Sequence, residues 1–458
     1  MSPPEKFDAI VIGAGQAGGP LSTALAKAGR RTVLIEREHV GGTCINEGCT
    51  PTKTMVASAR VAYLARRSMD YGVETGPVRV NLGRVRERKR AIVESFRGDS
   101  QQRIEATDGV DLVFGEARFT GPRTLAVNGR SLEAGLVFIN TGGRPAPPDV
   151  PGLDRVDPLD STSIMELGQV PEHLIVLGGG YIGLEFAQMF RRFGSRVTVI
   201  QRGRQLLPLE DEDIAGAVLS VLRDDGIDVL LEAEARCAER IDDTTVRVVA
   251  RTADGDRAIV GSRVLLAAGR VPNTERLEPL AAGVATDAKG FIRVNQRLET
   301  TAPGVYALGD VKGGPAFTHI SYDDYRIIRA NLLEGGGRTT ADRPVPYTVF
   351  MDPQLGRIGL TEREARKQGR AYRAATLPMS SVARALEMDE ARGMMKVLVD
   401  PESRQLLGAA VFGIEGGEIM AALQLAMMGN LPYDRIRDAV FAHPTLAESL
   451  NTLFSTLD

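Results

Sequence analysis

The fold is decided by the stretch FDAIVIGAGQAGGPLSTALAKAGRRTVLIE, Phe7 to Glu36. Its apolar start, its glycines and its apolar end predict a strand, a tight turn, a helix and a second strand. Gly13, Gly15 and Gly18 stand in the turn with the spacing G-x-G-x-x-G. The first glycine makes the turn, the second lets the backbone approach a pyrophosphate, and the third lets the helix pack on the strand. Since a helix N-terminus attracts anions, we expect a dinucleotide to bind here.

The chain repeats this pattern in EHLIVLGGGYIGLEFAQMFRRFGSRVTVIQ, Glu172 to Gln201. The two stretches align without a gap, so that the three glycines fall on Gly178, Gly180 and Gly183. A single G-x-G-x-x-G is a weak signal, but two copies in the same strand–turn–helix–strand context are a strong one. The repeat predicts two Rossmann-like units and two bound dinucleotides.

The last position of each repeat differs, and it predicts which dinucleotide binds where. Glu36 ends the first repeat, and a carboxylate there accepts a hydrogen bond from a ribose 2′-hydroxyl and repels a 2′-phosphate. This favours FAD or NAD. The second repeat ends on the neutral Gln201, followed by Arg202 and Arg204, and guanidinium groups favour the 2′-phosphate of NADP.

Length and composition describe an ordinary globular chain. Its 458 residues correspond to about three domains. The net charge of −3 and the absence of a long apolar run give no sign of a nucleic-acid partner or a membrane partner. The N-terminus leads directly into a strand, so we expect no signal peptide, and three cysteines suit a reducing cytoplasm.

Two of those cysteines lie in GGTCINEGCTPTK, Gly41 to Lys53. The residues after Cys49 predict a helix, and residues five apart in a regular helix rise about 7.5 Å. A disulfide needs Cα atoms about 4.4–6.8 Å apart, so a bridge from Cys44 to Cys49 requires an irregular lead-in, which Gly48 permits. Cys49 would then lie at a helix N-terminus, which stabilises a thiolate.

Three interpretations of this cysteine pair are open. A zinc site would need further ligands, and none of the four histidines lies at ligand spacing to the pair, so we expect no metal. An inert structural disulfide is the second interpretation. The composition and the neighbouring dinucleotide unit favour the third, a redox-active disulfide beside a flavin.

GGTCINEGCTPTK resembles the redox-active signature of the class I pyridine nucleotide–disulfide oxidoreductases, which include glutathione reductase, dihydrolipoyl dehydrogenase and mercuric reductase. Further segments resemble that family along essentially the whole chain: INTGGRP (139–145), LLAAGRVPN (265–273), TTAPGVYALGD (300–310) and FAHPTLAE (441–448).

The resemblance implies an α/β fold with two Rossmann-like dinucleotide-binding domains, for FAD and NAD(P), and an α+β dimerisation domain at the C-terminus. The implied division places the first part of the FAD domain at 1–146, the NAD(P) domain at 147–271, the second part of the FAD domain at 272–342 and the dimer-interface domain at 343–458. It also implies a homodimer with shared active sites.

The family's catalytic roles carry over to matching positions. Cys44 would attack the substrate, and Cys49 would face the flavin. Lys53 would lie near flavin N5 and pair with Glu185, while Tyr181 would shield the flavin until nicotinamide arrives. His443, oriented by Glu448, would serve as acid and base for the cysteines of the other subunit. The cofactor contacts would be Gly13, Gly15, Gly18, Glu36, Gly42, Thr43, Lys53, Ala117, Thr141, Gly142, Asp310, Thr318, His319, Gly178, Gly180, Tyr181, Ile182, Gly183, Gln201, Arg202, Arg204 and Gly269.

Departures from the family pattern narrow the function. Mercuric reductases typically have a C-terminal cysteine pair and a tyrosine at the place of His443, and dihydrolipoyl dehydrogenases usually have an acidic residue at the place of Gln201. The segments 317–333, 345–365 and 443–454 look most like mercuric-reductase-like flavoproteins associated with reactive-chlorine resistance. Glu47, between the cysteines, stands where the family usually has an apolar residue, and its role is open.

Three functions follow from these observations. The first is an enzyme that passes a hydride from NADPH through FAD to the Cys44–Cys49 disulfide and on to a small oxidised thiol-reactive substrate. The second is a mercuric-ion or cupric-ion reductase that uses the same dithiol. The third is a flavin redox sensor without turnover, which the complete Cys–Cys–His–Glu set disfavours because a sensor needs no proton shuttle.

Overall fold

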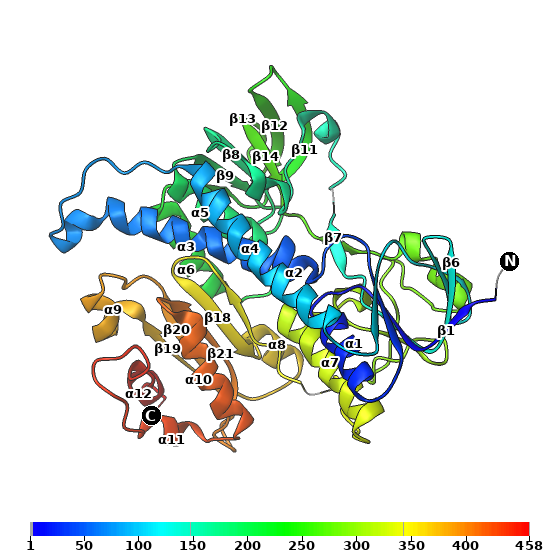
Figure 1. Cartoon of the computed structure of the whole chain (residues 1–458). Helices are drawn as coiled ribbons and strands as arrows, with labels where there is room; N and C mark the ends of the chain where they lie inside the picture. Colours follow the sequence, from blue (N-terminus) through cyan, green and yellow to red (C-terminus); the bar gives the residue numbers. More distant parts are fainter. Residues whose placement is uncertain (1–2, 147, 342, 458) are drawn as a thin grey trace. The chain divides into compact units, whose positions relative to one another are not determined.

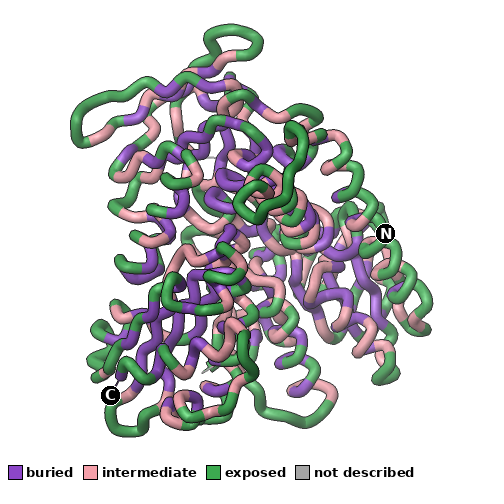
Figure 2. The backbone as a smooth tube through the Cα atoms, turned by 90° about the vertical axis from the view of Figure 1, so that its left-hand side faces the viewer, coloured by how far each residue is buried: buried purple, intermediate pink, exposed green. Residues whose placement is uncertain are grey.

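The computed structural model of the chain describes residues 3–146, 148–341 and 343–457 (Figure 1). Buried residues gather in the strands and along the inner faces of the helices, and the exposed residues lie on turns and outer faces (Figure 2). None of the described helices is both long enough and apolar enough to cross a membrane.

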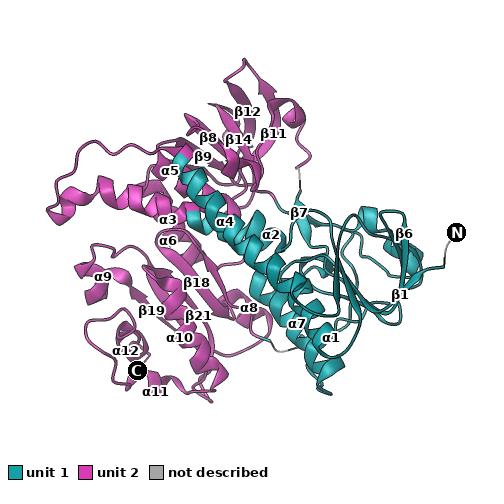
Figure 3. Ribbon diagram, in the orientation of Figure 1, with its two compact units in different colours: residues 1–54, 84–146, 269–343 teal, residues 55–83, 147–268, 344–458 magenta. Residues whose placement is uncertain are grey.

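The chain folds into two compact units (Figure 3). The first comprises residues 1–54, 84–146 and 269–343, and the second comprises 55–83, 147–268 and 344–458. The chain passes between the units near 54, 83, 146, 268 and 343, so residues 55–83 of the predicted 1–146 segment belong to the second unit. The assignment of each segment to a cofactor or to the dimer interface stays a prediction.

The first unit contains a seven-stranded sheet in the order β3-β2-β1-β6-β5-β4, with β16 paired to β6. Strands β3, β2, β1, β6 and β16 pair in parallel, whereas β5 pairs antiparallel with β6 and β4 pairs antiparallel with β5. A separate two-stranded sheet joins β7 to β15. The strands are β1 Glu5–Ile12, β2 Thr32–Glu36, β3 Val110–Phe114, β4 Arg118–Gly121, β5 Thr124–Val127, β6 Arg130–Ile139, β7 Gly143–Pro145, β15 Arg270–Pro272 and β16 Val305–Ala307.

Helices α1 and α7 of this unit pack on each other, and α1 also packs on the sheet. The helices are α1 Gly18–Lys27, α2 Gly42–Asn46, α3 Cys49–Arg66, α4 Leu82–Glu105 and α7 Thr318–Leu333. Helix α3 begins in the first unit and ends in the second.

The second unit holds a parallel sheet, β10-β9-β8-β14, and two antiparallel sheets, β11-β12-β13 and β17-β18-β21-β20-β19. The strands are β8 His173–Leu177, β9 Arg196–Ile200, β10 Asp228–Leu230, β11 Glu234–Arg240, β12 Val246–Thr252, β13 Gly255–Gly261, β14 Arg263–Leu266, β17 Tyr347–Val349, β18 Gln354–Gly359, β19 Arg373–Pro378, β20 Met394–Val399 and β21 Leu406–Gly413. The helices are α5 Tyr181–Phe193, α6 Glu212–Asp224, α8 Glu362–Lys367, α9 Ala383–Glu387, α10 Gly416–Met428, α11 Tyr433–Arg437 and α12 Ser449–Ser455.

The predicted repeat is confirmed as β1–α1–β2 in the first unit and β8–α5–β9 in the second. Both turns need their first glycine, because Gly13 has φ 101° and Gly178 has φ 119°. A Cβ on the third glycine would lie 2.0 Å from the carbonyl oxygen of Gly13 in one turn and 2.2 Å from that of Gly178 in the other. The spacing G-x-G-x-x-G therefore follows from the backbone geometry of each turn.

Candidate active site

The glycine turn of the first unit is held by the side chain that ends β2. The Glu36 carboxylate accepts hydrogen bonds from the backbone N–H of Ala14 at 2.8 Å and of Glu38 at 2.9 Å. Asn140 supports the turn from β6, since its amide donates to the Gly13 carbonyl at 3.1 Å. Each Glu36 oxygen keeps a second lone pair, which fits the expected bond to a ribose hydroxyl.

Asp310 follows β16 and lies in the same unit. Burial raises the pKa of its carboxyl group, while the nearby Arg270 and Lys312 oppose that shift. Its carboxylate makes no hydrogen bond with any described residue. A half-buried carboxylate without a donor fits the hydroxyl and pyrophosphate region of FAD, which would supply donors. At Gly142, with φ 67°, an added Cβ would meet open space, so the backbone can approach a ligand closely.

The two cysteines lie on adjacent short elements beside this turn. Cys44 belongs to α2 and is half-buried, whereas Cys49 is the exposed first residue of α3. The predicted position at a helix N-terminus is confirmed. A Cβ on Gly42 would lie 2.7 Å from the Gly15 Cα, so the cysteine segment touches the glycine turn. Gly48 is needed for space, because a Cβ there would lie 2.9 Å from the Thr43 carbonyl oxygen.

Both cysteines are free thiols in this structure, and they interact with each other. The hydrogen bond to Cys49 is the largest influence on Cys44 and raises the pKa of its thiol; burial and the charge of Cys49 raise it further. Thr318 and Lys53 lower the same pKa. Thr318 opens α7, and its Oγ1 lies 3.4 Å from the Cys49 Sγ. The negative charge of the singly deprotonated pair therefore belongs on Cys49, at the helix N-terminus.

Lys53 and Glu185 lie in different units, and their predicted ion pair stays a prediction. Within the second unit, the Glu185 carboxylate on α5 is buried and accepts the backbone N–H of Phe350 at 2.8 Å.

The second glycine turn is held in the same way as the first, but by an amide. The Gln201 Oε1 accepts the backbone N–H of Gly179 at 3.0 Å, and its Nε2 donates to the Gln205 carbonyl at 3.1 Å. Gln201 thus takes the structural place of Glu36. A Cβ on Gly180 would meet open space, which fits close approach of a pyrophosphate.

The two arginines after Gln201 differ in their surroundings. Arg202 is exposed and makes no hydrogen bond or ion pair with the described residues. Arg204 forms an ion pair with Glu212, the first residue of α6, and both side chains are exposed. Arg202 is therefore the cation that is available to a 2′-phosphate without breaking an existing contact.

Tyr181 begins α5, directly after the second glycine turn. Its half-buried ring lies against the Tyr347 ring of β17, with centroids 5.1 Å apart. The neighbouring Ile182 is exposed.

His443 and Glu448 lie in contact, as the family resemblance implied. The His443 Nδ1 lies 2.9 Å and 3.0 Å from the two carboxylate oxygens of Glu448. A carboxylate only accepts, so Nδ1 carries the hydrogen and Nε2 points away from Glu448 with its lone pair available. The His443 side chain is 73% exposed, which suits a group that acts on atoms outside its own subunit.

The remaining predicted contacts Ala117, Thr141, His319 and Gly269 all lie in the first unit. Ala117 is buried, the Thr141 hydroxyl donates to the Asn273 carbonyl at 2.8 Å, and His319 stacks on Phe317. Gly269 has φ 138° and faces open space. Sequence reasoning missed Asn140 and Tyr347, whose partners Gly13 and Glu210 lie far from them in the chain.

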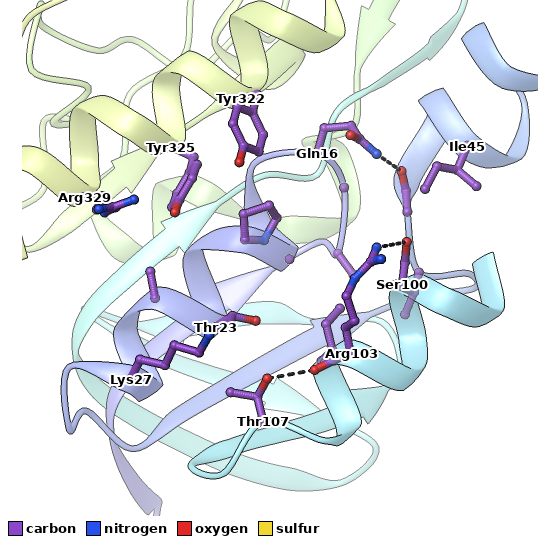
Figure 4. A pocket seen from close by; sticks show the side chains of 18 of the residues that line it. Gln16, Thr23, Lys27, Ile45, Ser100, Arg103, Thr107, Tyr322, Tyr325 and Arg329 are labelled. Atoms are coloured by element: carbon purple, nitrogen blue, oxygen red, sulfur yellow. Dashed lines mark hydrogen bonds between the residues drawn. The ribbon is translucent and has the colours of Figure 1, made fainter. Parts of the chain in front are cut away.

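A cavity of about 940 Å³ lies along α1 between α4 and α7 (Figure 4). Gly15 and Gln16 reach it from the glycine turn, but it extends to Lys27 and Arg329. Neither cysteine of the pair lines it, and neither do Glu36 and Asp310. The cavity therefore adjoins the first turn without containing the predicted chemistry. Among residues 3–146, 148–341 and 343–457, no three His, Cys, Asp or Glu side chains are arranged as a metal site.

Comparison with known proteins agrees with this fold. Residues 7–324 match the family model for pyridine nucleotide-disulphide oxidoreductase, and residues 345–454 match the model for the dimerisation domain of those proteins. The chain is 40% identical to the probable pyridine nucleotide-disulfide oxidoreductase RclA of Escherichia coli strain K12, over 98% of this chain and 99% of that protein. It is 33% identical to a mercuric reductase of Staphylococcus aureus, over 99% of this chain and 82% of that protein.

A solved structure is similar over the whole length. It is the Cu(II) complex of the HOCl-induced flavoprotein disulfide reductase RclA from Escherichia coli. The two chains superpose with a TM-score of 0.90 and share 39% sequence identity, over 98% of this chain and 100% of that chain.

Proposed function

Because the chain belongs to the pyridine nucleotide-disulfide oxidoreductase family, we propose that it is a homodimeric flavoprotein that uses NADPH to reduce a small oxidised, thiol-reactive substrate. The family makes it an oxidoreductase that depends on FAD and a pyridine nucleotide. The observation that carries the finer proposal is the interacting thiol pair of Cys44 and Cys49, which lies against the first glycine turn.

The first unit would hold FAD through the glycine turn, Glu36 and Asp310. Bound FAD supplies a two-electron carrier that accepts a hydride from NADPH and reduces the Cys44–Cys49 disulfide. The chain's own contribution is to hold Cys49 at the start of α3, where the helix dipole and the Thr318 hydroxyl stabilise a thiolate.

The reduced pair would then act on an oxidised substrate such as a disulfide. The Cys44 thiolate attacks one sulfur of the substrate, forming a mixed disulfide and releasing one thiolate. The Cys49 thiolate attacks the Cys44 sulfur, which reforms the Cys44–Cys49 disulfide and releases the second thiolate. The dithiol loses two electrons and the substrate disulfide gains two, while two protons end on the released thiols.

His443 of the partner subunit would move those protons. It would take the proton from Cys44 as that sulfur attacks, and return a proton to the leaving thiolate. The need for such a base is supported by the raised pKa of the Cys44 thiol, which would otherwise remain protonated near neutral pH. The Glu448 carboxylate fixes the ring so that Nε2 is the atom that exchanges the proton, and it stabilises the imidazolium.

The second unit would bind NADPH at the turn of β8–α5. Arg202 would contact the 2′-phosphate, with Arg204 contributing if its exposed pair with Glu212 opens. Exposed ion pairs are worth only about 0–1 kcal/mol, so this opening is a small cost.

A metal ion is the second candidate substrate. The RclA structure to which the chain is similar holds Cu(II), and a dithiol that reduces disulfides can also give electrons to a thiol-binding metal ion. His443 stands where mercuric reductases typically have a tyrosine, and this favours cupric over mercuric ion within this candidate.

The experiment is steady-state NADPH oxidation by the FAD-loaded protein with glutathione disulfide, lipoamide, hypothiocyanite, mercuric ion and cupric ion. Cys44→Ser serves as the matched control, because it removes the attacking sulfur and leaves both cofactor sites unchanged. We expect turnover with a thiol-reactive oxidant that Cys44→Ser abolishes. Turnover with none of the five, in protein that its flavin shows to be loaded, would favour the redox sensor and contradict the proposal.

A further inference from the structure

Tyr181 rests on a buried group of charged and polar residues in the second unit. Its ring lies against Tyr347, with an interplanar angle of 36° and a centroid distance of 5.1 Å. The Tyr347 hydroxyl donates to a carboxylate oxygen of Glu210. A hydrogen bond between the two phenol groups influences the pKa values of both tyrosines.

Glu210 is itself fixed by cations. The Arg357 Nε donates to the other Glu210 oxygen at 3.0 Å, and its Nη2 lies 2.8 Å from the same oxygen. Arg357 is the cross-strand partner of Tyr347 in the β17–β18 pair. Lys396 adds contacts to Asp211 at 3.5 Å and to Glu362 at 2.6 Å. We call Glu210, Asp211, Tyr347, Arg357 and Lys396 the Glu210 cluster.

Burying the charged side chains of the Glu210 cluster costs free energy. Glu210 is 1% exposed, Arg357 is 2% exposed and Lys396 is 3% exposed. Burying ions costs free energy that their attraction repays only with good geometry, and apolar residues of similar volume often serve stability equally well. What the cluster provides beyond stability is a fixed position for the Tyr347 ring and hydroxyl.

We propose that Tyr347, held by Glu210 and Arg357, is a positioning residue that keeps Tyr181 in its resting conformer and thereby sets how readily the nicotinamide ring displaces it. This rests on the proposed function, in which Tyr181 shields the flavin until nicotinamide arrives. The stack and the hydroxyl chain are made among the chain's own residues. They therefore stabilise the conformer that Tyr181 adopts before coenzyme binds, and their loss favours coenzyme binding.

The first test needs no coenzyme. The full-length protein is prepared with 3-fluorotyrosine at position 181, and its ¹⁹F resonance is compared with that of the same protein carrying Tyr347→Phe. We expect the resonance to shift and broaden, because the ring loses its hydrogen-bonded anchor. Tyr71→Phe is the matched control, since the Tyr71 hydroxyl also donates a hydrogen bond, to the Met388 carbonyl at 2.7 Å, and neither residue belongs to the Glu210 cluster. A resonance that Tyr347→Phe leaves unchanged, or that both variants move equally, overturns the proposal.

The second test measures the dissociation constant of NADP⁺ by calorimetry in the FAD-loaded protein. Tyr347→Phe should lower it about two- to tenfold, the range expected for one intramolecular hydrogen bond, when Tyr181 is present. In a Tyr181→Phe background the same substitution should have no effect. An equal change in both backgrounds, or weaker binding, contradicts the proposal. If the unaltered protein fails to bind NADP⁺, the proposed function fails, and the ¹⁹F experiment still decides whether Tyr347 positions Tyr181.

Discussion

The two glycine turns have similar backbone geometry but are followed by different residues. In both, the side chain that ends the repeat returns to the turn: Glu36 accepts the Ala14 N–H, and Gln201 accepts the Gly179 N–H. After Glu36 the chain continues into the cysteine pair, and after Gln201 it continues into the exposed Arg202. Under the proposed function, each turn would supply a pyrophosphate site, and the residues at its end and beyond it would decide which dinucleotide binds and what chemistry follows.

The largest expected effect concerns the cysteine pair, which only the first turn has. Cys44→Ser homodimers should lose substrate reduction because the attacking sulfur is gone. His443→Gln homodimers should lose it by about a hundredfold or more because the general acid–base is gone. If each site combines Cys44 of one subunit with His443 of the partner subunit, heterodimers of the two variants have one intact site. An equal mixture after subunit exchange should then recover roughly a quarter of the unaltered activity. Exchange without any recovery would show that the site is not shared.

The next largest effect exchanges the distinguishing side chain between the turns. Gln201→Glu gives the second turn the carboxylate of the first, which repels a 2′-phosphate, so kcat/KM for NADPH should fall about tenfold or more while that for NADH changes little. The substitution also removes the donor to the Gln205 carbonyl, and we expect a loss of about 1 kcal/mol in the free energy of unfolding. In the unaltered enzyme, an NADH efficiency equal to that of NADPH would contradict the NADPH assignment.

A smaller effect separates the two arginines that follow Gln201. Arg202→Gln should lower kcat/KM for NADPH by roughly tenfold, because a charge-assisted contact contributes about 1.5–3 kcal/mol. Arg204→Gln is the matched control and should have a clearly smaller effect, since that guanidinium is already paired with Glu212. Neither substitution should alter kcat/KM for NADH. A larger loss from Arg204→Gln would reverse the assignment of the phosphate contact.

The smallest expected effect concerns Glu47, which has no counterpart after the second turn. It is half-buried and stands at the end of α2, two residues before Cys49. If its carboxylate faces the dithiol, it disfavours a second negative charge, so Glu47→Val should lower the pH at which the thiolate forms by a few tenths of a pKa unit to about one unit. The measurement is a pH titration of the thiolate–flavin absorbance band in the reduced enzyme. Superimposable curves would mean that Glu47 is a loop residue without this role.

The residues themselves predict the turns and the start of α3, and the family resemblance implies the His443–Glu448 contact. Each of these features depends on residues close together in the chain. Each turn needs a glycine with positive φ and a second glycine packed against a carbonyl oxygen. These requirements produce the G-x-G-x-x-G spacing, which can be recognised from the sequence alone. The position of Cys49 at a helix N-terminus can be predicted for the same reason, since it depends on only a few neighbouring residues.

The contacts that sequence could not predict join distant segments. The hydrogen bonds from Tyr347 to Glu210 and from Asn140 to Gly13 depend on which segments become neighbours in the fold. The residues next to Tyr347 and Asn140 in the chain give no sign of these partners. The pairing of Arg204 with Glu212 crosses from a loop to the start of a helix. Two arginines that look equivalent in the sequence are therefore different in the structure.

The central claim is that electrons entering at the second turn reach the dithiol beside the first. Anaerobic titration with NADPH, followed by absorbance, tests it directly. The unaltered enzyme should develop a long-wavelength band on two-electron reduction, from the Cys49 thiolate beside the oxidised flavin. Cys44→Ser should keep that band and Cys49→Ser should abolish it. Retention of the band in both variants, or reduction of the unaltered enzyme without any band, would contradict the account.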